Sequence, residues 1–335
     1  MSREKPTLLF TQGDVAGIGP EILARAWPSL LEFSLPVAVG DIVWMNKALK
    51  LVGSQAVAVE SVLPGDVLPS ETRVPCIAAA TVPLNEVAPG KVDAAAGRAA
   101  YDFLVRAIDL TMAGKADAVV TCPLHKEGLH LAGLNFPGHT EILAQRTGAK
   151  EHVMILALEE LAVAHVTLHL PLSQVFQELS IPRIAARARL LHDLLAGVLG
   201  RAPRLAAAAL NPHGSDGGIF GNEEAELIAP AVKLCQNQGL NIVGPIPADT
   251  LFLRASQGEF DGVVAMYHDQ GHIALKLLGQ RRAVNITAGL PIIRTSVAHG
   301  TAYDIAWQGK ADGNSLLTAA RWAVRLGKSQ FGLLD

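Results

Sequence analysis

Short apolar runs alternate with longer segments of helical periodicity along most of the chain. The first run, Pro6–Thr11, is followed by Gly19-Pro20, where a proline in the first turn of a helix costs no hydrogen bond. Residues 94–113 carry apolar side chains at helical spacing, and Ala118–Thr121 returns to a strand-like run. Strands that alternate with helices predict an α/β fold with a largely parallel sheet covered on both faces.

Further elements follow from the same periodicities. Residues 181–200 form a long amphipathic helical pattern that ends at Gly200, a residue type that often closes helices. Residues 55–87 are rich in proline and valine, and we expect them to form an antiparallel excursion. The remaining expected strands are 35–40, 161–168, 205–210 and 262–267, and the remaining expected helices are 223–238 and 315–326.

Composition limits the class of protein. A chain of 335 residues, half of them hydrophobic, is long enough for two domains with sizeable cores. The net charge of −3, with lysine and arginine scattered, gives no electrostatic reason to expect a nucleic acid partner. Three cysteines without CxxC spacing favour a reduced, cytoplasmic protein. No signal-peptide core and no apolar run of the ~20 residues that span a bilayer are present, so we expect no membrane association.

Most of the apolar strands are followed by a polar loop that carries a histidine. GVVAMYHDQGHIALK, residues 262–276, passes from a buried run into His268, while TLHLPL and NPHGSDGG place His169 and His213 after two other runs. Ligands of open α/β sheets bind beyond the carboxyl ends of strands, so these loops are expected to converge. Three neutral imidazoles at one point would suit a divalent transition metal; the alternative is three ordinary buried or exposed histidines. Asp269 would orient one imidazole or cap the loop.

Two loops of small residues each leave two interpretations open. GDVAGIGPE, after the first strand, is either an anion cradle at a helix N-terminus or a strand-to-helix turn. HGTAYD, residues 299–304, is either a helix start or a loop whose backbone approaches a flat ligand such as adenine.

Three polar side chains stand at intervals among apolar neighbours near the last strands. They are Lys276, Asn285 and Arg294. Arginine can fork onto two oxygens of a phosphate or carboxylate, and lysine supplies a point charge. These residues are either an anion-binding group or three unrelated surface residues.

Nine segments in order resemble one known family. They are GDVAGIGPEI, PLHK, FPGHTE, TLHLPL, LNPHGSDGGIFGNEE, GPIPADT, AMYHDQGH, VNITAGLPIIRTSVAHGTAYDIA and GKAD. From about Leu8 to Ala319 the chain resembles the family of 4-hydroxythreonine-4-phosphate dehydrogenase, an enzyme of pyridoxal phosphate biosynthesis related to isocitrate and isopropylmalate dehydrogenases. The resemblance implies two α/β/α domains around a cleft, in a homodimer with active sites between subunits. Residues 1–125 with about 285–335 would form the cofactor side, and 126–284 the domain with the metal ligands and the dimer interface.

The resemblance also implies roles for individual residues. His169, His213 and His268 match the family's metal ligands, and one of them, His268 or preferably His169, would cross the dimer interface. The implied substrate-binding residues are His139, Thr140, Lys276, Asn285 and Arg294. The implied neighbours of the cofactor's adenosine part are His299, Gly300, Thr301, Ala302 and Asp304.

The implied reaction is an NAD- or NADP-linked oxidation, with decarboxylation, of 4-phosphohydroxy-L-threonine. A divalent cation (zinc, magnesium, cobalt or manganese) would lower the pKa of the alcohol and stabilise the enolate left by carbon dioxide. The basic residues would hold the phosphate and fix the substrate's orientation. The proton acceptor stays open between Lys276, Asp249 and a metal-bound water.

Departures from the family pattern add a second substrate. The biosynthetic branch is expected to carry leucine in place of His272, and the GHI form here resembles a branch that oxidises 4-phospho-threonate or 4-phospho-erythronate. Cys122 replaces an expected small residue and is given no catalytic role. A metal-dependent hydrolase and a non-catalytic binder of a phosphorylated metabolite are the alternatives from other classes. The HGTAYDIA loop favours the dehydrogenase, since a hydrolase has no use for an adenine site.

Overall fold

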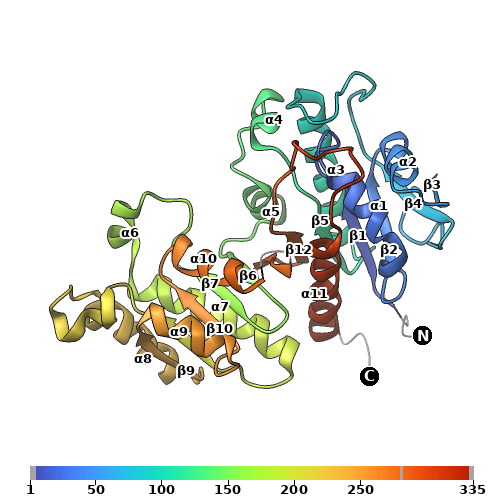
Figure 1. Ribbon diagram of the computed structural model, residues 1–335. Coiled ribbons are helices and arrows are strands. Elements are labelled where there is room, and N and C mark those ends of the chain that lie inside the picture. The colour runs from blue at the N-terminus through green and yellow to red at the C-terminus, as the bar shows by residue number, and fades with distance from the viewer. Residues whose placement is uncertain (1–4, 280–281, 332–335) are drawn as a thin grey trace. The chain divides into compact units, whose positions relative to one another are not determined.

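The structure is a computed structural model that describes residues 5–279 and 282–331 (Figure 1). The chain divides into two compact units. Unit 1 consists of Met1–Glu151 and Leu290–Asp335, and unit 2 consists of His152–Gly289.

Unit 1 is built on six parallel strands in the order β3-β4-β2-β1-β5-β12. The strands are β1 (Thr7–Thr11), β2 (Leu35–Gly40), β3 (Val57–Glu60), β4 (Arg73–Ala78), β5 (Ala118–Thr121) and β12 (Ile293–Val297). The helices are α1 (Gly19–Leu30), α2 (Ile42–Leu51), α3 (Ala94–Met112), α4 (Lys126–Leu131), α5 (His139–Thr147) and α11 (Asn314–Phe331).

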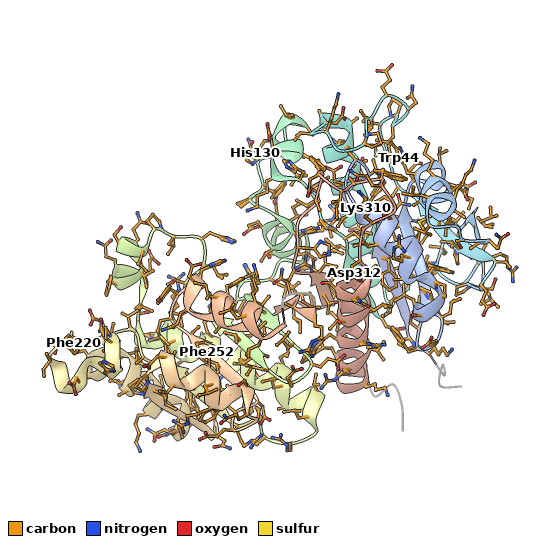
Figure 2. The ribbon with its side chains drawn as sticks, in the orientation of Figure 1. Trp44, His130, Phe220, Phe252, Lys310 and Asp312 are labelled. Atoms are coloured by element: carbon orange, nitrogen blue, oxygen red, sulfur yellow. The ribbon has the colours of Figure 1, made fainter. Side chains whose placement is uncertain are left out.

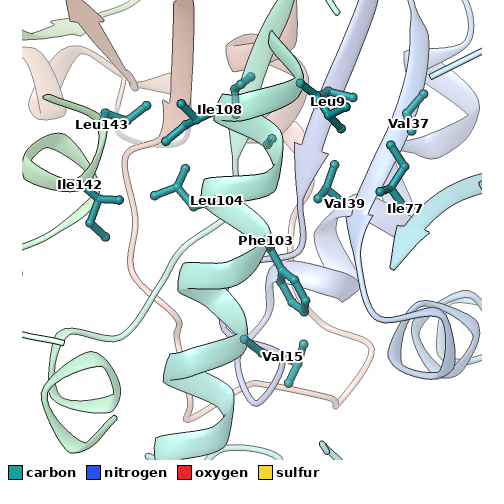
Figure 3. Packing of buried hydrophobic residues seen from close by; sticks show 14 of the residues in the cluster. Leu9, Val15, Val37, Val39, Ile77, Phe103, Leu104, Ile108, Ile142 and Leu143 are labelled. Carbon is teal, nitrogen blue, oxygen red and sulfur yellow. The ribbon is translucent and has the colours of Figure 1, made fainter. Parts of the chain in front are cut away.

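The strand β1 is buried along its whole length because helices cover both faces of the sheet. Leu9 belongs to a buried cluster with Phe103 and Leu104 of α3, which Figure 3 shows. Leu8 and Phe10 are fully buried and point to the opposite face, since side chains alternate along a strand. There α1 and α11 contact each other and the neighbouring strands. Burial of one such side chain contributes about 1.5–3 kcal/mol.

Residues 55–87 do not form the expected antiparallel excursion. β3 and β4 run parallel to each other, and β4 runs parallel to β2. The antiparallel expectation was therefore wrong. The connection between the two strands, through Ser70, is long enough to bring the chain back in the same direction, which a tight hairpin turn cannot do.

Unit 2 carries the strands in the order β11-β6-β7-β10-β8-β9. They are β6 (Val153–Ala157), β7 (Ala162–His165), β8 (Leu205–Ala208), β9 (Ile242–Ile246), β10 (Gly262–Ala265) and β11 (Val284–Ala288). β6 is antiparallel to β7 and β11, and the other pairs are parallel. The helices are α6 (Leu172–Glu178), α7 (Ile181–Leu199), α8 (Ala229–Asn237), α9 (Ala248–Ser256) and α10 (His268–Gly279). The expected α/β fold with a largely parallel sheet is thus confirmed.

The unit bounds differ from the sequence-based domains in residues 126–151. These residues form α4 and α5, which pack on α3 within unit 1. A Cβ on Gly97 of α3 would lie 2.1 Å from the carbonyl oxygen of Gly128, so glycine allows α3 and α4 to touch. Arg146 of α5 donates two hydrogen bonds to Asp109 of α3, at 2.8 and 2.7 Å.

One expected helix is modified in the structure. The expected helix 223–238 starts with a wider turn, Glu224–Ile228, before α8. Residues 299–304 form a loop of irregular and turn structure, and the next helix starts at Asn314, so of their two interpretations the structure does not show the helix start. Within the described part of the chain, no helix combines the length and apolarity that a membrane span requires.

Candidate active site

Two of the three expected metal ligands lie side by side in unit 2. His268 starts α10 directly after β10, and His169 follows β7. β7 and β10 are parallel neighbours, so their carboxyl ends lie at the same edge of the sheet. The two ring centroids are 6.0 Å apart. Both residues line a cavity of about 370 Å³, together with Leu168, Leu170, Pro171, Leu172, Val175, Tyr267 and Asp269.

The HDQGH segment explains how α10 is fixed at this edge. Nδ1 of His268 donates to Oδ1 of Asp269 at 2.6 Å, which leaves Nε2 of the ring for another ligand. The amide of Gln270 accepts a hydrogen bond from the backbone N–H of Met266 and donates one to the carbonyl of Ala209. His268, Asp269 and Gln270 therefore each have a hydrogen-bond partner. The bond to Nδ1 of His268 agrees with the interpretation in which Asp269 is the partner of an imidazole.

His272 extends the segment into the interior, and it contacts a histidine that the sequence analysis did not single out. His165, at the end of β7, is buried, and its Nε2 lies 3.1 Å from Nδ1 of His272. Burial and the nearby charges of His268 and Lys276 lower the pKa of His272 to about 4. Burial, followed by His272 and His268, also lowers the pKa of His165. Both inner rings are therefore neutral at pH 7; a histidine inside the run LAVAHV was the available sequence signal.

His213 lies in a left-handed turn. Five consecutive residues, His213 to Gly217, have φ between 45 and 69°, although three of them are not glycine. The turn is clamped at its start by the buried Glu224, whose Oε1 accepts from the backbone N–H groups of Leu210 and Asn211 at 2.8 and 2.7 Å. In the described residues, no three His, Cys, Asp or Glu side chains are grouped closely enough to hold a metal. One chain thus pairs His169 with His268 but does not add His213 to them.

Arg294 and His139, two expected substrate-binding residues, lie together in unit 1. Arg294 of β12 is 4% exposed and donates a hydrogen bond to Oγ1 of Thr121 at 2.7 Å. Burial lowers the pKa of Arg294 to about 9, so the guanidinium stays charged at pH 7. Burial and the charge of Arg294 lower the pKa of His139, which starts α5 beside the half-buried Thr140. A buried cation next to a neutral imidazole is suited to an anionic ligand.

The other expected polar residues belong to unit 2. Lys276 is half-buried about two turns after His268 on α10, which corresponds to ~12 Å of helix rise. Asn285 lies in β11 opposite Leu156. Asp249 is exposed in the first turn of α9. Among the described residues, the structure shows no hydrogen bond between His268 and either Lys276 or Asp249.

The 299–304 loop packs on the glycine-rich loop of unit 1. The carbonyl of Thr301 accepts a hydrogen bond from Ile18 N–H at 3.0 Å. The hydroxyl of Tyr303 donates to Oδ2 of Asp14 at 2.7 Å. Burial raises the pKa of Asp14 although this hydrogen bond opposes the rise. Sequence reasoning missed the Asp14–Tyr303 pair, which no short-range spacing reveals.

Packing accounts for the glycines of GDVAGIGPE. A Cβ on Gly17 would lie 2.9 Å from Thr301, and one on Gly19 would lie 2.0 Å from the carbonyl oxygen of Gln12. The N–H of Gly17 already bonds the carbonyl of Asp14. These contacts favour the strand-to-helix turn over the anion cradle.

Gly300 differs from those glycines. Apart from Gly300 itself and its two chain neighbours, no heavy atom of the described residues lies within 4 Å of where its Cβ would be, and its φ is not in the left-handed region. His299, Gly300 and Asp304 are exposed, whereas Thr301 is buried. The chain's own packing thus does not require glycine here. Nearby, Trp307 donates to the carbonyl of Val15 and lies edge-on to Trp44, which Figure 2 labels.

Comparison with known proteins identifies the family. A family model described as pyridoxal phosphate biosynthetic protein PdxA matches residues 32–323. The chain belongs to the PdxA family. The D-threonate 4-phosphate dehydrogenase of Cupriavidus necator is 43% identical over 330 residues, which cover 97% of this chain and 98% of the relative. The 4-hydroxythreonine-4-phosphate dehydrogenase of Beijerinckia indica is 42% identical over 319 residues, which cover 95% and 94%.

Solved PdxA structures have the same fold. The crystal structure of 4-hydroxythreonine-4-phosphate dehydrogenase from Klebsiella pneumoniae superposes with a TM-score of 0.86 at 41% identity, covering 96% of this chain and 100% of that one. The resemblance stated from the nine sequence segments is therefore confirmed. The matches to relatives named as dehydrogenases cover nearly the whole length of both chains. The chain is therefore an oxidoreductase that acts on CH–OH groups. The hydrolase and the non-catalytic binder are set aside.

Proposed function

We propose that this PdxA protein oxidises a four-carbon hydroxy acid phosphorylated at its terminal carbon, with a nicotinamide cofactor, NAD or NADP, and one divalent metal ion. 4-Phosphohydroxy-L-threonine, oxidised with decarboxylation, is the first candidate substrate. The observation that carries the proposal is the pairing of His169 with His268 at the cavity edge, in a chain of this family.

The donor set fits a divalent transition metal. Imidazole nitrogen suits zinc and cobalt, and the carboxylate of Asp269 on Nδ1 of His268 is the partner that a metal-binding histidine usually has. His169, His213 and His268 would hold the ion. When bound, it would polarise the hydroxyl group to be oxidised, and the nicotinamide would accept the hydride.

His213 would reach this site from a second copy of the chain. His169 and His268 are neighbours in one chain, so this assignment replaces the sequence-based preference for His169 as the residue that crosses. Exposed apolar side chains support a homodimer, since large exposed apolar residues often mark protein contacts. Ile219 and Phe220, next to the His213 turn, are 74% and 48% exposed, and Figure 2 shows Phe220 at the outer edge of unit 2. Ile273 and Leu277 are 58% and 83% exposed on α10.

Arg294 would bind the substrate's anionic end. Its charged guanidinium is buried, and an anion would compensate the desolvation that lowers its pKa. His139, Thr140 and Asn285 would supply further hydrogen bonds. Lys276 lies ~12 Å of helix rise from His268, which favours a role in binding charge over accepting the proton of the reacting hydroxyl. The exposed Asp249 and a metal-bound water remain candidates for the proton acceptor.

Residues 299–304 would contact the adenosine part of the cofactor. Thr301 and Tyr303 anchor the loop to unit 1, which leaves the exposed His299, Gly300 and Asp304, with the adjoining Ala302, to face a ligand. The space at the Gly300 Cβ position supports this role, because a flat ring of the cofactor can approach the protein backbone where no side chain projects.

4-Phospho-D-threonate is the second candidate substrate, followed by 4-phospho-erythronate. Relatives named for D-threonate 4-phosphate are as similar to this chain as those named for 4-hydroxythreonine-4-phosphate, at 43% and 42% identity. His272, in the GHI form of the motif, supports this branch. A cytoplasmic location agrees with three free, buried cysteines, since reduced thiols are typical of that compartment.

The test is an assay of reduced nicotinamide at 340 nm. 4-Phosphohydroxy-L-threonine and 4-phospho-D-threonate are assayed side by side. Each is tested with NAD and with NADP, before and after the protein is treated with a chelator. We expect turnover with one of the acids, loss of turnover with chelator and recovery on addition of Co²⁺ or Zn²⁺. Failure of every combination to reduce the cofactor would contradict the proposal.

A further inference from the structure

Behind the His169–His268 pair, imidazole rings continue into the interior of unit 2. The ring of His272 lies nearly parallel to that of His268, with centroids 3.8 Å apart and planes inclined by 12°. Nδ1 of His272 lies 3.1 Å from Nε2 of His165, so one ring donates a hydrogen bond and the other accepts it. We call His268, His272 and His165 the histidine row.

The two inner members of the row are fixed by the fold. His165 is 1% exposed and His272 is 7% exposed. His165 ends β7, which pairs with β6 on one side and β10 on the other. A Cβ on Gly271 would lie 2.4 Å from Nε2 of His165 and 2.7 Å from Cγ1 of Val163. Only glycine therefore lets α10 approach β7 closely enough to form the row.

The outer member, His268, has a weaker tether of its own. Its hydrogen bond goes to Asp269, the next residue in the chain, whose side chain is 68% exposed. This bond selects the protonated nitrogen, but an exposed neighbour can turn together with the ring. The χ2 torsion of histidine has a broad energy minimum, so the ring plane needs a second restraint. Stacking on the buried His272 supplies one.

Filling space does not explain two imidazoles at this position. Burying a ring nitrogen costs free energy unless the nitrogen is hydrogen-bonded. Nδ1 of His272 and Nε2 of His165 meet this requirement by bonding each other. Apolar side chains would fill the interface of α10 and β7 without any polar atom. The row therefore carries a constraint beyond packing.

We propose that His272, anchored by His165, is a positioning residue that sets the ring orientation of His268 for metal binding. The proposal rests on the proposed function, in which His268 is a metal ligand. A ligand held in its binding orientation loses less conformational freedom when the metal binds, which raises affinity. Loss of a group that orients a metal-binding histidine typically weakens metal affinity by about 10–100-fold.

The test is a Co²⁺ titration of the full-length protein without substrate or cofactor. Affinity is measured by competition with a chromophoric chelator, and ligand geometry by the visible absorption of bound Co²⁺. His272→Leu removes both the stacked ring and the hydrogen bond, whereas His272→Phe keeps a ring that can stack. His268→Ala removes the proposed ligand. His192→Leu, on α7 of the same unit, removes a half-buried imidazole outside the row as the matched control.

We expect His272→Leu to weaken Co²⁺ affinity by about 10–100-fold and to change the absorption band, with His272→Phe in between and His192→Leu unchanged. If His272→Leu does not fold, His272→Gln decides, because it keeps a polar side chain but removes the stacked ring: weaker binding than wild type supports the proposal, and equal binding overturns it. Wild-type affinity in a folded His272→Leu overturns the positioning role, while loss of binding in His268→Ala leaves the proposed function standing. Wild-type Co²⁺ binding in His268→Ala contradicts the proposed function itself.

Discussion

His268 and His213 are held in place by different physical means. His268 starts a regular helix and rests on buried neighbours, so close packing restrains it. His213 lies in a left-handed turn, where non-glycine residues are strained by roughly 1–2 kcal/mol each, and hydrogen bonds to Glu224 hold the start of the turn. A side chain held by packing thus depends on the volume of its neighbours, whereas a side chain in a strained turn depends on a few hydrogen bonds.

The largest expected effect comes from removing either imidazole. His213→Ala and His268→Ala are each expected to lower kcat/KM by more than the roughly 10–100-fold typical for loss of a residue that only orients a ligand. Circular dichroism melting should change little for His213→Ala, because its side chain is not part of the packed row. Normal metal content and turnover in His213→Ala would remove this residue from the site.

The next largest effect is expected from Gly271→Ala, which disturbs the close packing of α10 on β7 behind His268. The added methyl group would lie 2.4 Å from Nε2 of His165, so α10 must shift. Overpacking of this kind typically costs about 1–3 kcal/mol of unfolding free energy, and Co²⁺ affinity should fall with it. Gly300→Ala adds the same group where, apart from its two chain neighbours, no described residue has a heavy atom within 4 Å, and serves as the stability control. Equal melting of both variants would show that the close approach is not needed.

Glu224→Gln tests the hydrogen bonds that hold the start of the His213 turn, and its effect on stability depends on pH. Burial would raise the pKa of Glu224, but the hydrogen bonds from Asn211 and from the backbone outweigh it, and the pKa lies below its ordinary value of 4.5. The carboxylate therefore stabilises the fold above about pH 4.5, and this contribution is lost as the pH falls through the folded-state pKa.

Urea unfolding of wild type and Glu224→Gln at several pH values measures that contribution. We expect a loss of about 1.5–3 kcal/mol at pH 7, typical of hydrogen bonds to a charged group, that shrinks below pH 4.5. Glu226→Gln, an exposed neighbour, should be near neutral. A difference that stayed constant down to pH 3 would assign the effect to shape and not to charge.

The smallest effect is expected within the turn itself. Asp216 has φ 45° and ψ 54°, a left-handed conformation that glycine adopts without strain and a β-branched residue does not. Asp216→Gly should change the unfolding free energy by less than about 1 kcal/mol, whereas Asp216→Val should lower it by about 1–2 kcal/mol. Thermal melting separates the two, and equal melting temperatures would mean that the turn is not strained in solution.

The sequence predicted much of the fold because local patterns determine it. The expected strands 35–40 and 118–121 match β2 and β5, and the helix that ends at Gly200 matches α7. Parallel pairing of β3 with β4 was missed, since pairing direction depends on where a chain returns and not on its local pattern. The grouping of His165 with His272 and that of Asp14 with Tyr303 were also missed, because each joins residues that are far apart in sequence.

Subunit complementation tests most directly whether His169 and His268 of one chain combine with His213 of another. Two inactive variants, His213→Ala and His268→Ala, are co-expressed with different tags. Random pairing gives half heterodimers, each with one intact site of two, so about one quarter of wild-type activity should return. His169→Ala with His268→Ala should return none. Recovery only in the second pair would mean that His169 crosses between subunits, and recovery in both pairs would mean that His268 crosses. Recovery in neither would contradict a shared site built from these three histidines.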